Sequence, residues 1–222
     1  MAARPSFPGA AEFVPDSRAV DDLRTHAAGC RGCDLYADAT QTVFGSGNAH
    51  ARVMLVGEQP GDVEDTRGYP FVGPAGQVLR RGLTDAGLGD TPVFVTNAVK
   101  HFRFTERGRR RIHEKPTAAH ATACRPWLAA ELRAVRPAIV VALGATAAGS
   151  LFGSGFRLTA ARGQRLDWPP AKGDFADSDV DVQVAFATVH PSSILRTPDD
   201  ERDAAYAAFV ADLAVVAEAV RR

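Results

Sequence analysis

At 222 residues the chain is long enough to bury a sizeable hydrophobic core, and it fits one large domain better than two small ones. Its content of hydrophobic residues, 45%, and of charged residues, 23%, is that of an ordinary soluble globular protein. The 26 basic and 26 acidic residues cancel, which excludes a global electrostatic attraction to nucleic acid or to membranes.

The first 16 residues contain three prolines and no apolar run of signal-peptide length. We expect them to form a flexible tail (1–16) ahead of a single domain over 17–222. The most apolar stretch, 138–153, is too short and too interrupted by Gly, Ser and Thr to span a bilayer. We therefore expect a cytoplasmic protein without a membrane partner, whose three cysteines are ligands or free thiols rather than disulfides. We also expect it to act as a monomer.

Short apolar, β-rich runs alternate along the chain with segments of helical periodicity. Strands are expected at 51–57, 91–97, 137–144 and 182–190. Helices are expected near 17–28 and over about 74–88, 117–135, 145–152 and 200–222. This alternation predicts an α/β fold with three α/β/α layers and a central four-stranded parallel sheet.

Polar turns follow all four predicted strands. They read "GEQPGDVED" (57–65), "NAVKHF" (97–102), "GATAAG" (144–149) and "HPSSILR" (190–196). In parallel α/β sheets, ligands bind outside the carboxyl ends of the strands, where such turns meet. A single turn of this kind is more often structural, but four of them at one edge predict a binding site.

The cysteines suggest a metal site. Cys30 and Cys33 form a C-x₂-C pair with chelating spacing, Cys124 is the remaining cysteine, and His101 follows the second strand closely. By spacing alone, such a set most often indicates structural zinc, with an iron–sulfur cluster second. The alternative is an incidental pair and a buried Cys124 thiol. A redox pair is less favoured, because the motif follows a helix instead of starting one after a strand.

Positive charge gathers between Lys100 and Lys115. Seven basic and two acidic residues give this segment a net charge of +5, which points to a local anionic partner. At its centre, "GRRRIHEKP" (108–116) runs three arginines into His113. Two interpretations remain open: a solvated basic loop, as most basic runs are, or a loop that delivers His113 to a reaction site.

The stretch "GEQPGDVEDTRGYPFVGPAGQVL" (57–79) strongly resembles the first motif of the family 4 uracil-DNA glycosylases. "TNAVK" (96–100) and "HPSSILR" (190–196) resemble the second and third motifs, and the likeness covers nearly the whole chain from Cys30 onward. Three departures are informative. Gln59 replaces a small residue, "RRRIH" (109–113) is an inserted loop, and His101 stands where the family places a cysteine ligand. These departures resemble the UdgX branch, which forms a covalent adduct with uracil-containing DNA.

The resemblance implies a uracil-DNA glycosylase-like fold and the excision of uracil from single-stranded or double-stranded DNA. Because the glycosidic bond is out of reach inside a duplex, such an enzyme binds single strands or flips the base into a pocket. Phe71 would then stack on uracil, Asn97 would bond its N3 and O4, and His190 would donate to its O2. The residues expected at the uracil are Gly57, Gln59, Asp62, Phe71, Asn97 and His190.

The resemblance also assigns catalytic, DNA-binding and cofactor-binding residues. His113 is expected to attack C1′ of the deoxyribose as uracil leaves, which ends in a stable bond and a single turnover. Glu58 is the candidate for activating water instead. The catalytic set is His113, Glu58, Gln59 and His190, and the DNA-binding set is Arg109, Arg110, Arg111, Ser192 and Arg196. A [4Fe–4S] cluster is expected on Cys30, Cys33, His101 and Cys124.

Three other functions fit the sequence. One is a conventional family 4 enzyme with many turnovers, in which His113 only contacts phosphate. Another is a non-catalytic iron–sulfur module that grips single-stranded DNA with its basic loop. The third is an enzyme of small nucleotides, although neither a P-loop nor a G-x-G-x-x-G signature is present.

Overall fold

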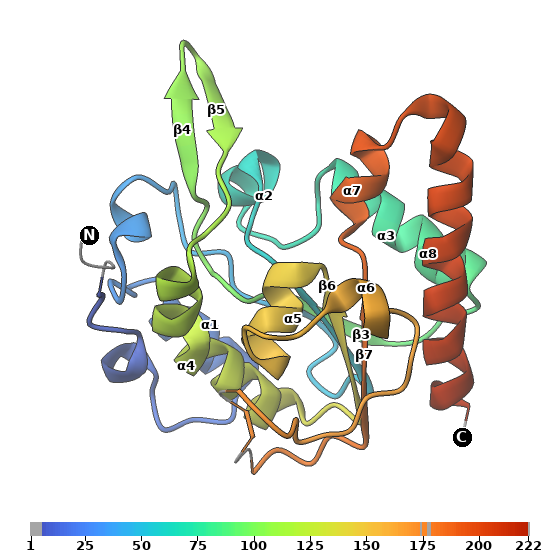
Figure 1. The fold of residues 1–222 in the computed structure, drawn as a ribbon. Helices are drawn as coiled ribbons and strands as arrows, with labels where there is room; N and C mark the ends of the chain where they lie inside the picture. The colour runs from blue at the N-terminus through green and yellow to red at the C-terminus, as the bar shows by residue number, and fades with distance from the viewer. Residues whose placement is uncertain (1–5, 174, 177–178, 222) are drawn as a thin grey trace.

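The computed structural model describes residues 6–173, 175–176 and 179–221. At its centre lies a five-stranded sheet in the order β1-β3-β2-β6-β7 (Figure 1). Four strands run parallel and coincide with the predicted ones: β2 (Val53–Gly57), β3 (Val93–Asn97), β6 (Ile139–Leu143) and β7 (Val184–Thr188). The fifth, β1 (Ser46–Gly47), pairs antiparallel at the edge and is too short to leave a periodic pattern in the sequence.

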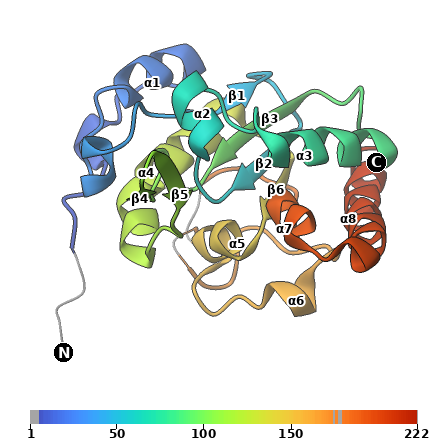
Figure 2. The same ribbon diagram turned by 90° about the horizontal axis from the view of Figure 1, so that it is seen from above.

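Helices cover both faces of the sheet (Figures 1 and 2). One face packs against α1 (Val20–Ala27), α4 (Ala118–Val135) and α5 (Ala145–Phe152). The other packs against α3 (Pro74–Asp85), α7 (Pro191–Arg196) and α8 (Asp199–Val220). The predicted three-layer α/β/α fold is therefore confirmed. The short helices α2 (Asp62–Arg67) and α6 (Leu158–Ala161) were not predicted. None of the helices in the described part of the chain combines the length and the apolar character that crossing a membrane requires.

Side-chain alternation along the strands builds a core on each face. Along β2, Met54 and Val56 pack toward α1, α4 and α5, whereas Val53 and Leu55 pack toward α3 and α8. The whole of β2 is buried, as expected of a parallel strand covered on both sides. Each fully buried aliphatic side chain of this kind stabilises the fold by about 1.5–3 kcal/mol. The two cores thus fix where the carboxyl ends of the strands lie.

Part of the expected flexible tail is packed against the domain. The amide of Gly9 donates to Gly32 O at 2.9 Å, and that of Ala10 donates to Ala123 O at 2.8 Å. Phe7 stacks on His120 with 4.8 Å between the ring centroids. Gly9 and Ala10 are small enough to fit a narrow space beside the cysteine loop, and composition alone does not reveal this packing. The tail predicted over 1–16 is thus not a free tail at 7–13, while residues 1–5 lie outside the described part.

The basic segment forms a β-hairpin, not the loop that the sequence suggested. Strands β4 (Phe104–Arg107) and β5 (Arg110–His113) pair antiparallel and project from the body beside α2 (Figure 1). The two-residue turn starts at Gly108, whose φ of 63° lies in the left-handed region that glycine adopts at little cost. Because strand side chains alternate, Arg111 and His113 share one face of the hairpin, and Arg110 and Ile112 share the other.

Candidate functional site

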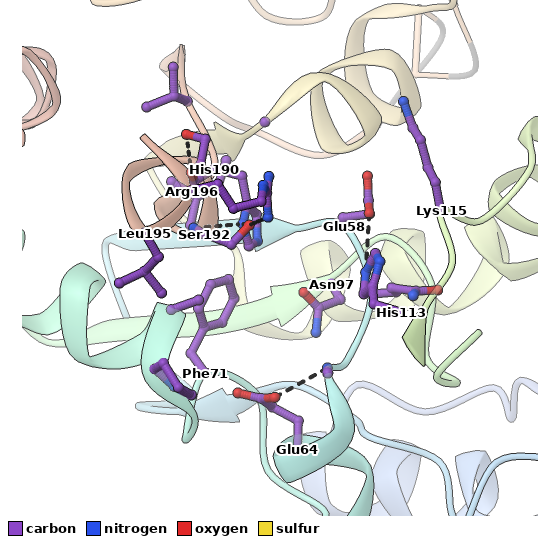
Figure 3. A pocket seen from close by; sticks show the side chains of 18 of the residues that line it. Glu58, Glu64, Phe71, Asn97, His113, Lys115, His190, Ser192, Leu195 and Arg196 are labelled. Atoms are coloured by element: carbon purple, nitrogen blue, oxygen red, sulfur yellow. Dashed lines mark hydrogen bonds and ion pairs between the residues drawn. The ribbon is translucent and has the colours of Figure 1, made fainter. Parts of the chain in front are cut away.

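A cavity of about 890 Å³ lies at the carboxyl edge of the parallel strands. Small-molecule pockets typically measure ~300–1,000 Å³. The turns after β2, β3, β6 and β7 all contribute to its wall, and the hairpin contributes from one side (Figure 3). The structure thus brings together many of the predicted site residues, namely Glu58, Gln59, Asp62, Phe71, Asn97, His113, His190, Ser192 and Arg196.

Asn97, at the end of β3, presents an unpaired amide to this cavity. The residue is 2% exposed, and its Oδ1 is buried without a hydrogen-bond partner in the described part of the chain. A buried acceptor left unpaired costs about 1–3 kcal/mol, which a donating ligand would recover. Gly57 makes room for it, since a Cβ there would lie 2.4 Å from Asn97 Oδ1 and 2.6 Å from Phe71 Cζ.

A buried ion pair fixes the end of β3 from behind. Lys100 Nζ lies 2.7 Å from Glu131 Oε2 and donates to the main-chain oxygen of Asn97, also at 2.7 Å. The Thr96 hydroxyl donates to Glu131 at 2.9 Å, and both charged residues are fully buried. A buried ion pair adds little net stability compared with apolar packing. Its effect here is to hold Asn97 in one position.

Phe71 forms an aromatic wall in a strained conformation. Its φ of 56° is uncommon for a residue other than glycine. Arg80 Nη1 donates to Phe71 O at 3.1 Å, and Gly76 leaves the necessary space, because a Cβ there would lie 1.8 Å from that oxygen. The Phe71 ring centroid lies 5.9 Å from that of His190. An aromatic ring and an imidazole therefore flank the same opening (Figure 3).

His190, the residue before α7, is held as a neutral donor. Its Nδ1 accepts from the Ser192 amide at 3.2 Å, which places the ring proton of the neutral form on Nε2. Burial, and then the charges of Arg196 and His113, lower the pKa of His190 to about 4. Arg196 Nη1 donates to the Ser192 hydroxyl at 2.9 Å. Ser192 and Arg196, which were both expected to bind DNA, thus also hold His190 in place.

His113 meets a carboxylate at the rim of the cavity. Its Nε2 lies 3.5 Å from Glu58 Oε1, and its side chain is 49% exposed (Figure 3). The other oxygen of Glu58 accepts a hydrogen bond from the Thr146 hydroxyl at the start of α5. The result is a chain from hydroxyl to carboxylate to imidazole, in which the carboxylate can orient the ring and take up a proton from it.

Gln59 closes the neck of the hairpin. Its Nε2 donates to Arg103 O at 3.1 Å and to Glu114 O at 3.0 Å, and its Oε1 accepts from Arg103 N at 3.2 Å. Arg103 and Glu114 are the residues on either side of the hairpin, so one amide joins its two ends. The sequence placed Gln59 at the uracil and in catalysis. The structure instead occupies both ends of its amide with main-chain groups.

Asp62 and Arg111 bind each other. Arg111 Nε lies 2.6 Å from Asp62 Oδ1, and its Nη1 lies 2.6 Å from Oδ2 of the buried Asp65. Asp62 lines the cavity, and this contact engages one oxygen of the carboxylate that was expected at the uracil. The expected phosphate contact of Arg111 does not fit this placement. Arg109 and Arg110, by contrast, are exposed at the tip of the hairpin.

The predicted metal ligands are all buried, and none of the cysteines forms a disulfide. Burial above all raises the pKa of the Cys124 thiol to about 12, and the nearby Cys33 and Cys30 add to this rise. The amide of Lys100 donates to Cys124 Sγ at 3.3 Å. His101 Nε2 bonds the Thr42 hydroxyl at 2.8 Å. Within the described residues, no three His, Cys, Asp or Glu side chains are grouped as ligands of one metal ion.

Comparison with known proteins identifies the family. Residues 44–214 match the model of the uracil DNA glycosylase superfamily. The chain belongs to the uracil-DNA glycosylase superfamily. The matched range contains the parallel strands, the hairpin and every residue that lines the cavity.

The curated relatives include several type-4 uracil-DNA glycosylases. That of Thermotoga maritima is 35% identical over 174 residues, which cover 78% of this chain and 81% of the relative. That of Archaeoglobus fulgidus is 38% identical over 133 residues, 60% of this chain and 63% of the relative. That of Sulfurisphaera tokodaii is 31% identical over 185 residues, 81% and 77% of the two chains. The resemblance to family 4 inferred from the motifs is therefore confirmed.

Several residues that line the cavity, or that contact its lining, were not predicted from the sequence. Thr146, which bonds Glu58, lies in a turn that was predicted to reach the site, so its hydroxyl was a detectable signal. Glu64 accepts from Gly73 N at 2.7 Å and from Gly61 N at 3.2 Å, and its spacing from Gly61 is that of a capping box. No pattern in the sequence singles out Lys115 or Leu195, which also line the cavity.

Proposed function

We propose that this member of the uracil-DNA glycosylase superfamily excises uracil from DNA and becomes linked through His113 to C1′ of the resulting deoxyribose. The observation that carries the proposal is the position of His113. The hairpin places this imidazole at the rim of the cavity, 3.5 Å from Glu58 and beside Asn97 (Figure 3). The type-4 relatives support uracil as the base.

The inner wall of the cavity supports recognition of a flipped uracil. The unpaired Asn97 Oδ1 can accept from N3–H, and its Nδ2 can donate to O4. Phe71 offers a ring for stacking, and the neutral His190 offers an Nε2–H to O2. A hydrogen bond aimed where charge develops lowers the barrier to departure.

The proposed reaction breaks one C–N bond and forms another. The C1′–N1 bond breaks with its electron pair moving onto uracil, and the charge on O2 is stabilised by His190. The unprotonated ring nitrogen of His113 gives its lone pair to C1′ and forms a new C–N bond. The resulting imidazolium passes its remaining N–H proton to Glu58, and uracil takes a proton from water. Because imidazole without activation is a poor leaving group, the protein is spent after one event.

Glu58 also supports a second candidate function. A carboxylate at this place can activate a water molecule, which would attack C1′ and regenerate the enzyme as in a conventional family 4 glycosylase. The two outcomes differ in what reaches C1′ first. His113, Gln59 and the inserted hairpin, which resemble the UdgX branch, favour capture by imidazole, since a group held about 3–3.5 Å from its target has a high effective concentration.

The DNA partner is proposed to lie across the mouth of the cavity. The β4–β5 hairpin, whose tip carries Arg109 and Arg110, and helix α7, which carries Ser192 and Arg196, project side by side above the sheet with α2 between them (Figure 1). Contacts to backbone phosphates from both elements would position the strand while the base enters. The uracil can come from a single strand or from a duplex in which it is flipped.

A [4Fe–4S] cluster is the proposed cofactor, held by Cys30, Cys33, His101 and Cys124. Three buried cysteines outside disulfides and one buried histidine supply the donors that a cluster needs. The spacing alone fits zinc or a cluster, and the resemblance to family 4 favours the cluster. When bound, the cluster would cross-link the N-terminal loop, the end of β3 and α4. Protein purified without oxygen should be brown and contain iron and sulfide; a colourless protein with stoichiometric zinc would overturn this assignment.

Denaturing electrophoresis tests the main proposal. The wild-type protein is mixed with a labelled uracil-containing oligonucleotide and boiled in detergent. A parallel reaction contains a thymine-containing oligonucleotide instead. We expect a shifted band with uracil only, lost in His113→Ala and retained in His50→Ala, a control at an exposed histidine. Release of free uracil over many turnovers without a band would support the conventional enzyme. Binding without bond cleavage would support a non-catalytic module.

A further inference from the structure

Arg111 differs from its basic neighbours in having no free donor. An arginine carries five N–H donors. Its Nε bonds Asp62 Oδ1, and its Nη1 bonds Asp65 Oδ2 and, at 3.1 Å, the Thr40 hydroxyl. Its Nη2 lies 3.4 Å from Asp62 O and 3.3 Å from the Thr66 hydroxyl. Each donor therefore has an acceptor on the protein, and none is left for a phosphate.

Aromatic rings enclose the same guanidinium. Its central carbon lies 5.1 Å from the Phe104 ring centroid and 5.6 Å from that of Phe102. The side chain is only 22% exposed, and its partner Asp65 is fully buried. A planar guanidinium suits this combination of bidentate and stacked contacts, and lysine does not.

The tip arginines have a different environment. Arg109 and Arg110 are exposed, and within the described residues neither has a salt bridge. Arg110 lies opposite the exposed Arg107 across the hairpin, on the face turned away from Arg111. Because side chains alternate along β5, Arg110 faces solvent, whereas Arg111 contacts α2.

The same alternation connects Arg111 to His113. The two residues are two positions apart on β5, so their side chains leave the same face about 7 Å apart. A contact that fixes Arg111 on α2 therefore fixes the direction in which His113 points. Gln59 holds the neck of the hairpin, and Arg111 holds its middle.

We propose that Arg111 is a positioning residue that docks the hairpin on α2 and so sets His113 against Glu58, while the tip arginines contact DNA. The inference rests on the proposed capture by His113. It predicts that the hairpin is docked before DNA arrives, so binding need not order it.

The test compares Arg111→Ala with Arg110→Ala. Because Arg111→Ala leaves the buried Asp65 without its cation, a second variant combines Arg111→Ala with Asp65→Asn, whose amide still accepts from the Thr40 main chain. Three quantities are measured: the rate of adduct formation at saturating uracil-containing single-stranded DNA, the dependence of DNA affinity on salt, and hydrogen exchange over 104–113 in the free protein.

In both Arg111 variants we expect the saturating rate to fall at least about tenfold and hydrogen exchange over the hairpin to accelerate. The slope of log affinity against log salt should stay at the wild-type value. Arg110→Ala should instead lower that slope by about 0.7, the loss of one phosphate contact on a single strand. An Arg111→Ala protein with the lower slope, wild-type exchange and the wild-type saturating rate would overturn the inference. If the wild type forms no adduct, the proposed function fails, and hydrogen exchange alone still decides whether Arg111 docks the hairpin.

Discussion

Replacing Gln59 with leucine should loosen the hairpin neck while keeping the size of the side chain. The change removes three hydrogen bonds. Arg103 O keeps a partner, because the Glu114 amide donates to it at 3.0 Å, but Arg103 N and Glu114 O lose theirs. A buried polar group without a partner costs about 1–3 kcal/mol. Because water reaches the half-buried neck, we take about 2 kcal/mol for Arg103 N and Glu114 O together. If that energy appears fully as lost docking of His113, the rate falls by roughly 30-fold, since about 1.4 kcal/mol is tenfold.

The assay is adduct formation in a single turnover, with protein in excess over a labelled uracil-containing strand. Gln164→Leu is a control, because the Gln164 amide also donates to a main-chain oxygen, at 3.0 Å, but at α6 instead of the neck. We expect Gln59→Leu to be slow and Gln164→Leu to match the wild type, with the preference for uracil over thymine unchanged in both. A Gln59→Leu protein that forms adduct at the wild-type rate would show that Gln59 does not hold His113 in place. Altered base preference would instead return Gln59 to the uracil.

Three further predictions follow from the cavity. Gly57→Ala places a Cβ 2.4 Å from Asn97 Oδ1. Uracil excision should therefore fall by about 100-fold or more, while the fold stays intact. Near-normal excision would show that Gly57 does not border the uracil pocket. Thr146→Val takes a hydrogen bond from Glu58 and should slow adduct formation about tenfold, while Thr146→Ser restores it; equal rates in the two variants would show that the hydroxyl is not needed. Because the pKa of His190 is lowered to about 4, the unfolded state binds its proton first as pH falls below about 6.5. Urea unfolding should therefore show the wild type losing stability relative to His190→Gln between about pH 6.5 and 4, and a constant difference would contradict this pKa.

The sheet and the place of the site could be predicted because they depend on local patterns. Four apolar runs of strand length mark the parallel strands, and the carboxyl-edge rule then gathers the turns that carry Glu58, Asn97 and His190. Both inferences need only the order of residues along the chain. The edge strand β1 and helix α2 were missed, since two and six residues are too few to show a period.

The roles of the hairpin residues could not be predicted, because they depend on register. As a loop, "RRRIH" gives its three arginines one role. As strand β5, it alternates, and Arg111 turns toward two aspartates. Gln59 likewise depends on the three-dimensional distance between a turn and the two ends of a hairpin. Its partners, at 103 and 114, lie 44 and 55 positions away along the chain.

Capture of C1′ by His113 can be tested by locating the new bond. The complex formed with a uracil-containing oligonucleotide is digested with nuclease and protease, and the modified peptide is sequenced by tandem mass spectrometry. We expect a deoxyribose remnant on the imidazole of His113, with one equivalent of uracil released per protein. A remnant on any other residue, or unmodified peptide beside many equivalents of uracil, would contradict it.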